Sequence, residues 1–287
     1  MPKLNTANPE VRDFLLGIAK HYITEFDIDG WRLDVANEID HEFWRAFRKT
    51  VKAAKPDAYI VGEIWHYSMD WLHGDQYDAV MNYHFGQAIY KFLTQSPEVP
   101  DGHTLADRMT SLELSYPLPV IRAGFNLMES HDTARLISLV GGSLAKARQA
   151  WLVFALLPGS PCFYYGSEFG MTGGEDPDCR RCMPWEEEHQ VPGQYEFITG
   201  IIGLRKSHIE LCNRGMRQWI YDDAIPGLFG MRVYNGTEQL TVILNRNDAV
   251  LPLKDYNRYL KDEEIVSGGF TDIPENGFAY ALTQKRD

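Results

Sequence analysis

The sequence predicts an α/β fold in which helices cover a parallel β-sheet, followed by a small all-β domain. In roughly the first 210 residues, short and nearly continuous apolar segments alternate with segments whose apolar residues recur at helical spacing. This alternation is typical of strand–helix units whose sheet is buried on both faces. From about residue 213, apolar and polar residues alternate in short runs, which indicates antiparallel hairpins. The expected domains are therefore 1–212 and 213–287.

The first two strand–helix units are expected within residues 1–65. Pro9 follows Asn8 at the start of a helical pattern, as in a first helical turn. A strand is predicted at about 28–35, and Asn37 is predicted to cap a helix that continues to about residue 55. The apolar run AYIVGEIW predicts the next strand at about 58–65.

The same alternation continues along the chain. Three further strands are predicted at about 77–83, 124–130 and 162–168. Helices are predicted at about 84–95, 103–114, 144–157 and 194–209. In the last domain, Tyr234-Asn235-Gly236-Thr237 has the composition of a hairpin turn.

Composition excludes several classes of partner. Acidic side chains outnumber basic ones by 40 to 28, giving a formal net charge of −12. That balance argues against nucleic acid and anionic membrane surfaces and is compatible with a neutral polar ligand. The sequence has no uninterrupted apolar run long enough to span a membrane, and its start lacks the pattern of a signal peptide.

The four cysteines are too few for a disulfide scaffold and indicate a reducing, cytoplasmic location. Cys179 and Cys182 have the spacing of half a zinc site, but no second pair accompanies them. No acidic loop has the ligand spacing of a calcium site. We therefore expect structural cysteines, no metal and no cofactor.

Three acidic residues follow predicted parallel strands. Asp34, Glu63 and Asp132 all lie at or just beyond the carboxyl end of a strand, and His131 precedes Asp132. In α/β proteins this edge of the sheet is where ligands bind and reactions occur. One acid there is compatible with a helix cap, whereas three equivalent ones indicate a site.

The surroundings predict different roles for two of these acids. Arg32 and Asp34 are two residues apart, so on a strand they share a face, and the cation favours the ionised carboxylate that a nucleophile requires. Glu63 has apolar sequence neighbours, including Trp65, and no adjacent cation, so burial is expected to favour its protonated form, as in a general acid. A pair of carboxyl groups with unequal proton affinity is typical of glycoside hydrolysis. Trp65 and Tyr83, near strand ends, are candidate stacking surfaces for sugar rings, although aromatic residues at such positions also form cores.

Three segments resemble signature motifs of the α-amylase superfamily: GWRLDVANEID, IVGEIWH and FNLMESHDTAR. The variants MPKLN, VANEID and GEIWH resemble its neopullulanase, cyclomaltodextrinase and maltogenic amylase branch. The resemblance implies a retaining α-glucan hydrolase with a (β/α)8 TIM-type barrel. The matching part would be a partial barrel, strands four to eight, followed by a C-terminal antiparallel β-sandwich.

The resemblance also implies a role for each matched residue. Asp34 would be the nucleophile, Glu63 the acid/base and Asp132 a transition-state stabiliser. His131 would hold the same sugar, and Arg32 would orient Asp34. Asp176 and Arg180 are weaker candidates for neighbouring subsites, and a loop salt bridge would explain them equally well.

The resemblance leaves the activity of the chain open. A family motif from the end of the third barrel strand does not match any segment, so we expect the C-terminal part of a longer enzyme with little activity in isolation. The expected substrate is an α-glucan oligosaccharide (a cyclodextrin, pullulan or a maltooligosaccharide), hydrolysed at its α-1,4 bonds, and cleavage of α-1,6 bonds is left open. The alternatives are a glucan transferase and a non-catalytic, glucan-binding remnant. The oligomeric state is not predicted.

Overall fold

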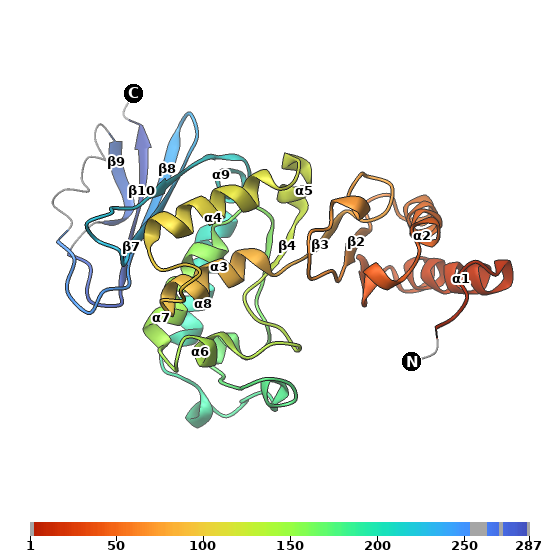
Figure 1. Ribbon diagram of the computed structural model, residues 1–287, viewed down its shortest axis with the longest axis horizontal. Helices are drawn as coiled ribbons and strands as arrows, with labels where there is room; N and C mark the ends of the chain where they lie inside the picture. Colours follow the sequence, from red (N-terminus) through yellow and green to blue (C-terminus); the bar gives the residue numbers. More distant parts are fainter. Residues whose placement is uncertain (1–2, 253–262, 270–271, 286–287) are drawn as a thin grey trace. The chain divides into compact units, whose positions relative to one another are not determined.

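The computed structural model describes residues 3–252, 263–269 and 272–285 (Figure 1). These residues fall into two compact units. The first comprises Met1–Asn82 with Tyr116–Phe125, and the second comprises Tyr83–Ser115 with Asn126–Asp287.

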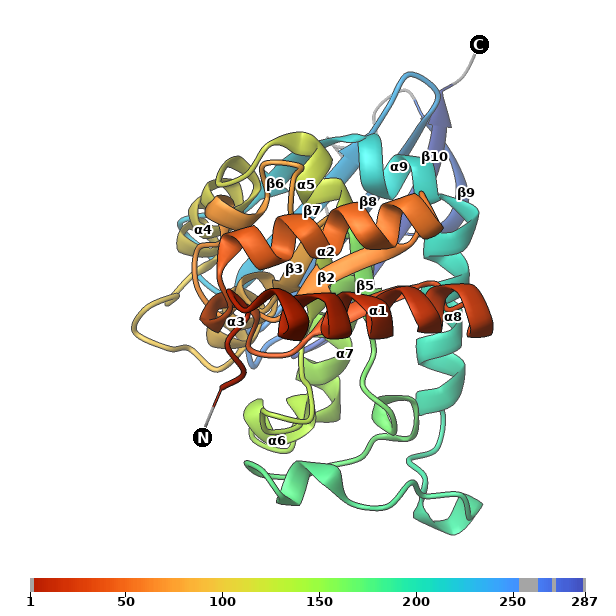
Figure 2. The same ribbon diagram turned by 90° about the vertical axis from the view of Figure 1, so that its right-hand side faces the viewer.

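The first unit combines two long helices with parallel strands. Helices α1 and α2 lie side by side in both views (Figures 1 and 2). The elements are α1 (Pro9–Phe26), β1 (Gly30–Leu33), α2 (His41–Ala54), β2 (Tyr59–Gly62), β3 (Ala79–Asn82) and the short α5 (Leu118–Ala123). In the parallel register, Arg32 pairs with Val61, and Val61 pairs in turn with Ala79.

Side-chain caps determine where the first two helices begin. The Asn8 side chain accepts hydrogen bonds from the N–H groups of Glu10 and Val11, and α1 begins at Pro9, where the sequence predicted a helix start. The predicted start of the second helix at Asn37 is wrong, because Ala36–Glu38 forms a separate 3-10 turn. Asp40 caps α2 instead and accepts from the N–H of Phe43 at 2.8 Å.

The core of the first unit joins both helices to the strands. Its buried members on these elements are Ala19, Ile23, Leu33, Phe43, Trp44, Phe47, Val51 and Ile60. Burial of such side chains contributes about 1.5–3 kcal/mol each, so this cluster holds β1 and β2 beneath the helices. The ends of these two strands are thereby fixed relative to each other.

The second unit contains most of the remaining helices. They are α3 (His84–Leu93), α4 (Gly102–Leu114), α6 (Leu136–Leu139), α7 (Leu144–Ala155), α8 (Gln194–Ser207) and α9 (Ile209–Arg214). Strand β5 (Ser160–Cys162) ends where the sequence predicted a strand to begin. The expected strand at 162–168 is wrong beyond Cys162, because Gly166 takes a positive φ of 81° and begins a 3-10 turn at Ser167–Phe169.

The parallel strands form one sheet in chain order, β1-β2-β3-β4-β5, with β4 at Phe125–Leu127. The described C-terminal strands form an antiparallel sheet in the order β6-β7-β8-β10-β9. These are β6 (Met216–Ile220), β7 (Leu228–Tyr234), β8 (Glu238–Asn245), β9 (Glu263–Gly269) and β10 (Phe278–Lys285). The α/β class with a C-terminal antiparallel sheet is thus confirmed.

The predicted hairpin turn connects β7 to β8. The Asn235 side chain accepts hydrogen bonds from the N–H groups of Thr237 and Glu238, both at 2.8 Å. Met231 of β7 and Val242 of β8 share a buried cluster with Trp151 of α7. Because helices and sheet share this core, the second compact unit continues across residue 212, and the domain boundary there stays a prediction.

Candidate active site

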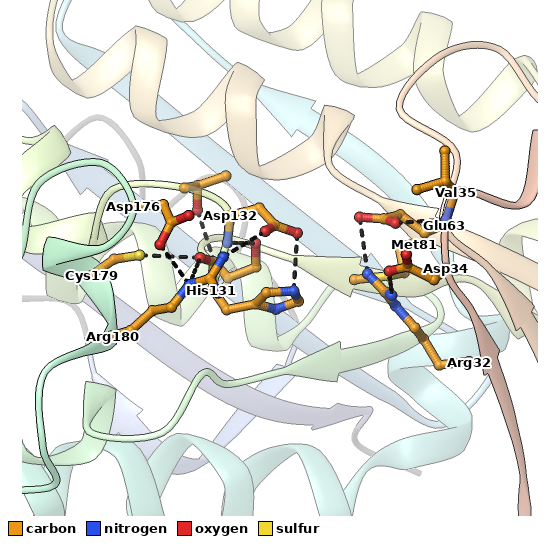
Figure 3. A network of polar contacts seen from close by, with 12 residues as sticks. Arg32, Asp34, Val35, Glu63, Met81, His131, Asp132, Asp176, Cys179 and Arg180 are labelled. Atoms are coloured by element: carbon orange, nitrogen blue, oxygen red, sulfur yellow. Dashed lines mark hydrogen bonds and ion pairs between the residues drawn. The ribbon is translucent and has the colours of Figure 1, made fainter. Parts of the chain in front are cut away.

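Arg32 lies between two carboxylates at the ends of β1 and β2 (Figure 3). Its Nη1 forms a short ion pair with Oδ1 of Asp34. Its Nη2 lies 2.9 Å from Oε1 of Glu63, and its Nε donates to the Met81 sulfur at 3.3 Å. One guanidinium therefore links both acids, which is a geometry that suits the rigid fork of arginine.

The two linked acids differ strongly in burial. The Asp34 side chain is 75% exposed, whereas that of Glu63 is 7% exposed. Glu63 is held by further donors: the N–H of Val35 reaches Oε2 at 3.0 Å, and Nε1 of Trp65 reaches Oε1 at 3.3 Å. Glu63 is thus fixed in orientation, and Asp34 is the more accessible carboxylate.

The backbone near these acids is constrained on both strands. Val35 has a left-handed φ of 41°, which is unfavourable for a β-branched residue. Gly62 precedes Glu63, and a Cβ there would lie 2.7 Å from the Tyr77 ring. A larger residue at position 62 would displace that ring, so glycine is required immediately before the acid.

The expected surroundings of Glu63 require one correction. Its burial is confirmed, since the residue is 5% exposed. The expectation that it has no neighbouring cation is wrong, because pairing of β1 with β2 brings Arg32 against it from another strand. What separates Asp34 from Glu63 is therefore exposure to water and not the presence of a cation.

A second polar network, in the second unit, surrounds Asp132 (Figure 3). Its carboxylate lies 3.1 Å from Nη2 of Arg180 through Oδ1 and 3.1 Å from Nε2 of His131 through Oδ2. Nε of Arg180 also donates to the His131 carbonyl at 2.8 Å. His131, Asp132 and Arg180 therefore form one connected group.

Asp176 belongs to this same network. Its Oδ1 lies 2.8 Å from Nε of Arg180, four residues along the chain. Arg180 accordingly forms the loop salt bridge that the sequence allowed, and in addition it contacts Asp132. The subsite role of Asp176 and Arg180 stays a prediction, as does the approach of Asp132 to Asp34 and Glu63.

The two aromatic candidates differ in accessibility. Trp65 is 43% exposed and contacts Glu63, which leaves part of its ring available for a sugar. Tyr83, directly before α3, is only 5% exposed. Of the two, Trp65 is better placed for stacking.

Sequence reasoning overlooked the buried acid Glu129. It is 3% exposed, and its carboxyl forms short contacts with the hydroxyl of Ser167 and the N–H of Leu136. Burial raises the pKa of Glu129, and the hydrogen bonds from Ser167 and Leu136, together with the charge of Arg135, only partly oppose this. The available signal was an acid inside the apolar segment FNLMES, three residues before Asp132.

The described ranges contain no group of three or more histidine, cysteine or acidic side chains placed to hold a metal ion. Cys179 instead donates from its thiol to the His131 carbonyl at 3.2 Å. None of the helices in the described part of the chain is long and apolar enough to cross a bilayer.

A parallel strand–helix sheet with acidic side chains beyond its strand ends defines an α/β protein with a site at the carboxyl ends of its strands. More specifically, the chain belongs to the alpha-amylase family: residues 1–197 match its catalytic domain. The resemblance of the three sequence motifs to this family is therefore confirmed.

Several known proteins are similar to this chain. A cyclomaltodextrinase of Geobacillus thermopakistaniensis (strain MAS1) is 49% identical over 248 residues, which are 86% of this chain and 42% of that protein. An intracellular maltogenic amylase of Bacillus subtilis (strain 168) is 45% identical, covering 78% of this chain and 38% of that protein. The chain thus spans less than half the length of these curated relatives.

Among solved structures, a cyclic α-maltosyl-(1→6)-maltose hydrolase from Arthrobacter globiformis superposes with a TM-score of 0.86 at 32% identity. That match covers 98% of this chain and 62% of the hydrolase, which was solved in complex with cyclic α-maltosyl-(1→6)-maltose.

Proposed function

We propose that this chain supplies the nucleophile and the acid/base of a retaining α-glucan hydrolase. The observation that carries the proposal is the single guanidinium of Arg32 shared by an exposed carboxylate, Asp34, and a buried one, Glu63. Membership of the alpha-amylase family and relatives named cyclomaltodextrinase and maltogenic amylase support it. The substrate class is accordingly α-1,4-linked glucan oligosaccharides, including cyclic ones.

The reaction would proceed in two displacements. In the first, Asp34 attacks the anomeric carbon while Glu63 gives its proton to the departing glycosidic oxygen, so that a carbon–oxygen bond forms to Asp34 as the bond to the leaving sugar breaks. In the second, Glu63 removes a proton from water, which displaces Asp34 and restores both groups. Inversion at each step gives net retention.

The surroundings support this division of work. Asp34 is accessible, and its contact with Arg32 stabilises the negative charge that an attacking carboxylate carries. Glu63 is shielded from water and held by the Val35 N–H and the Trp65 indole, which orients its carboxyl for proton transfer. By the family resemblance, Asp132 and His131 would bind the hydroxyls of the distorted sugar, and Asp176 and Arg180 would contribute to neighbouring subsites.

The 287-residue chain alone is expected to turn over little substrate. It contributes five parallel strands, and β1 has only β2 as a neighbour in the described sheet. An open sheet edge leaves backbone groups and one side of the site unsupported. A reducing-sugar assay with maltotriose on the isolated chain tests this, and robust turnover would contradict it.

The function itself is tested in the complete protein that carries this sequence. With β-cyclodextrin and maltotriose, NMR of the first product should show the α-anomer. Asp34→Asn should abolish cleavage of every substrate, whereas Glu63→Gln should retain partial cleavage of a nitrophenyl α-maltoside, whose leaving group needs no proton. Cleavage by Asp34→Asn at the original rate, or a β-anomeric product, would overturn the proposal.

A further inference from the structure

A stacked aromatic pair in the first unit joins exposed Tyr67, which follows Glu63 in the sequence, to partly buried Tyr116. The ring of Tyr67 stacks on that of Tyr116, with centroids 5.2 Å apart and planes inclined by 14°. Tyr67 is 60% exposed although it is part of this stack. One face of the Tyr67 ring is covered by Tyr116, and the side chain leaves a large apolar surface in contact with water.

The pair is held in a fixed orientation. The Tyr116 hydroxyl accepts a hydrogen bond from the N–H of Ser68 at 2.9 Å, which anchors this ring beneath its partner. Ser68 is fully buried, and its own hydroxyl donates to the His66 carbonyl at 2.6 Å. These two hydrogen bonds of Ser68 therefore fix the turn that carries Tyr67, so the orientation of the ring is set before a ligand binds.

The position of Tyr67 relates it to the acid/base. It lies four residues beyond Glu63, so their Cα atoms are at most about 14 Å apart. Trp65 occupies the intervening stretch and donates to Glu63. Tyr67 is therefore within about 14 Å of the acid/base, a distance that a short maltooligosaccharide can span.

We propose that the stacked pair Tyr67–Tyr116 is a sugar-binding platform on the leaving-group side of the site, which selects longer glucans and sugar acceptors. The inference rests on the proposed function. A pyranose presents an apolar C–H face to an aromatic ring, and a rigid exposed ring binds such a face at little cost in conformational freedom.

The platform would also favour transfer over hydrolysis. A sugar held there presents a hydroxyl to the glycosyl–Asp34 intermediate. Glu63 takes the hydroxyl proton, the new bond forms between that oxygen and the anomeric carbon, and the bond to Asp34 breaks. No other reactant is needed, and water competes for the same carbon.

The test uses Tyr67→Ala in the complete protein, with Tyr67→Phe keeping the ring. Tyr195→Ala is a matched control, because Tyr195 is 51% exposed and stacks on Phe169 with centroids 5.8 Å apart and planes inclined by 12°. With maltopentaose as substrate and added maltose as acceptor, chromatography separates hydrolysis from transfer products.

We expect Tyr67→Ala to raise the KM for maltopentaose and to lower the transferred fraction, each about three- to tenfold, the range of a single aromatic contact. The kcat should fall by less than KM rises. Tyr67→Phe and Tyr195→Ala should behave as the wild type. An unchanged KM and transferred fraction in Tyr67→Ala, or an equal change in Tyr195→Ala, would overturn the proposal that the pair binds sugar.

Failure of the proposed function would be recognised separately. In that case the wild type would not cleave maltopentaose, yet calorimetric titration of the Asp34→Asn protein with maltopentaose still reports on the platform. Adding Tyr67→Ala to that protein should weaken binding about three- to tenfold. Equal affinities of the two proteins would contradict the inference independently of catalysis.

Discussion

The N–H of Val35 donates a hydrogen bond to Oε2 of Glu63 at 3.0 Å, so the residue after the exposed acid of β1 orients the buried acid of β2. Val35 makes this bond from a left-handed conformation, with φ at 41°. For a residue other than glycine, that conformation costs about 1–2 kcal/mol. Strain of this kind persists where surrounding structure compensates for it, and here it accompanies the orientation of Glu63.

Val35→Gly should relieve this strain. Glycine adopts positive φ freely but loses about 0.5–1 kcal/mol through backbone entropy, so the net effect expected is a gain of about 0.5 kcal/mol in the free energy of unfolding. Chemical denaturation measures it. Val250→Gly is the control: Val250 is also exposed, at 59%, and is not among the residues with positive φ, so it should lose about 0.5–1 kcal/mol. Equal losses in both variants would contradict strain at Val35.

Arg32→Lys should sharply reduce catalysis in the complete protein. Lysine keeps the charge but cannot place two nitrogens against Asp34 and Glu63 at once. We expect kcat/KM for maltotriose to fall about 100-fold or more, which is typical for the loss of one preorganised donor.

Arg45→Lys provides the control for that experiment. Arg45 also pairs with an acid, Asp75, but both side chains are about half exposed. Its kcat/KM should stay near that of the wild type. If Arg32→Lys were as active as Arg45→Lys, the bridge between the two acids would not matter for the reaction.

Asp78→Asn should destabilise the first unit. Burial by itself raises the pKa of Asp78, but hydrogen bonds from Lys52, the N–H of Ile60 and Arg48 outweigh it and lower the pKa overall. Removing the carboxylate leaves two partly buried cations without their partner. We expect a loss of about 2–3 kcal/mol in the free energy of unfolding at neutral pH.

The contribution of Asp78 should also depend on pH in a defined direction. Because the folded pKa is lowered, its stabilisation is present above the unfolded value of 3.8 and is lost as pH falls through the folded pKa. Denaturation at neutral pH and at about pH 3 should therefore show a smaller difference between wild type and Asp78→Asn under acid. Asp75→Asn, with a 43% exposed side chain, should cost about 0.5 kcal/mol or less.

Local sequence signals predicted much of this fold. Apolar runs identified the strands that precede Asp34 and Glu63, and the Asn8-Pro9 pair identified the start of α1. These features depend on residues close together in the chain. The Asn235 turn was predictable for the same reason.

Features that depend on pairing between distant segments were not predicted. The contact of Arg32 with Glu63 requires the register in which Arg32 pairs with Val61. That register cannot be deduced from the sequence of either strand alone. The start of α2 was misplaced because both Asn37 and Asp40 are good caps. The left-handed Val35 contradicts the preference of its residue type, so no local rule would suggest it.

Glu129 gives a pH dependence of opposite sign to that of Asp78. Burial raises its pKa above the ordinary value of 4.5. At a pH between 4.5 and the higher folded pKa, the folded protein therefore binds more protons than the unfolded one. Hydrogen bonds donated to Glu129 by the Ser167 hydroxyl and the Leu136 N–H oppose this rise in the pKa without outweighing it.

Glu129→Gln should therefore remove a destabilising ionisation. The contribution of Glu129 to stability is fully present below pH 4.5 and is lost as pH rises through the folded pKa. The free energy of unfolding of the variant should match that of the wild type near pH 4 and exceed it increasingly as pH rises from 4.5 to the folded pKa, since glutamine does not ionise. Denaturant titrations across this range measure the difference. A difference that stays constant with pH, or one that favours the wild type at pH 8, would show that Glu129 does not titrate in this way.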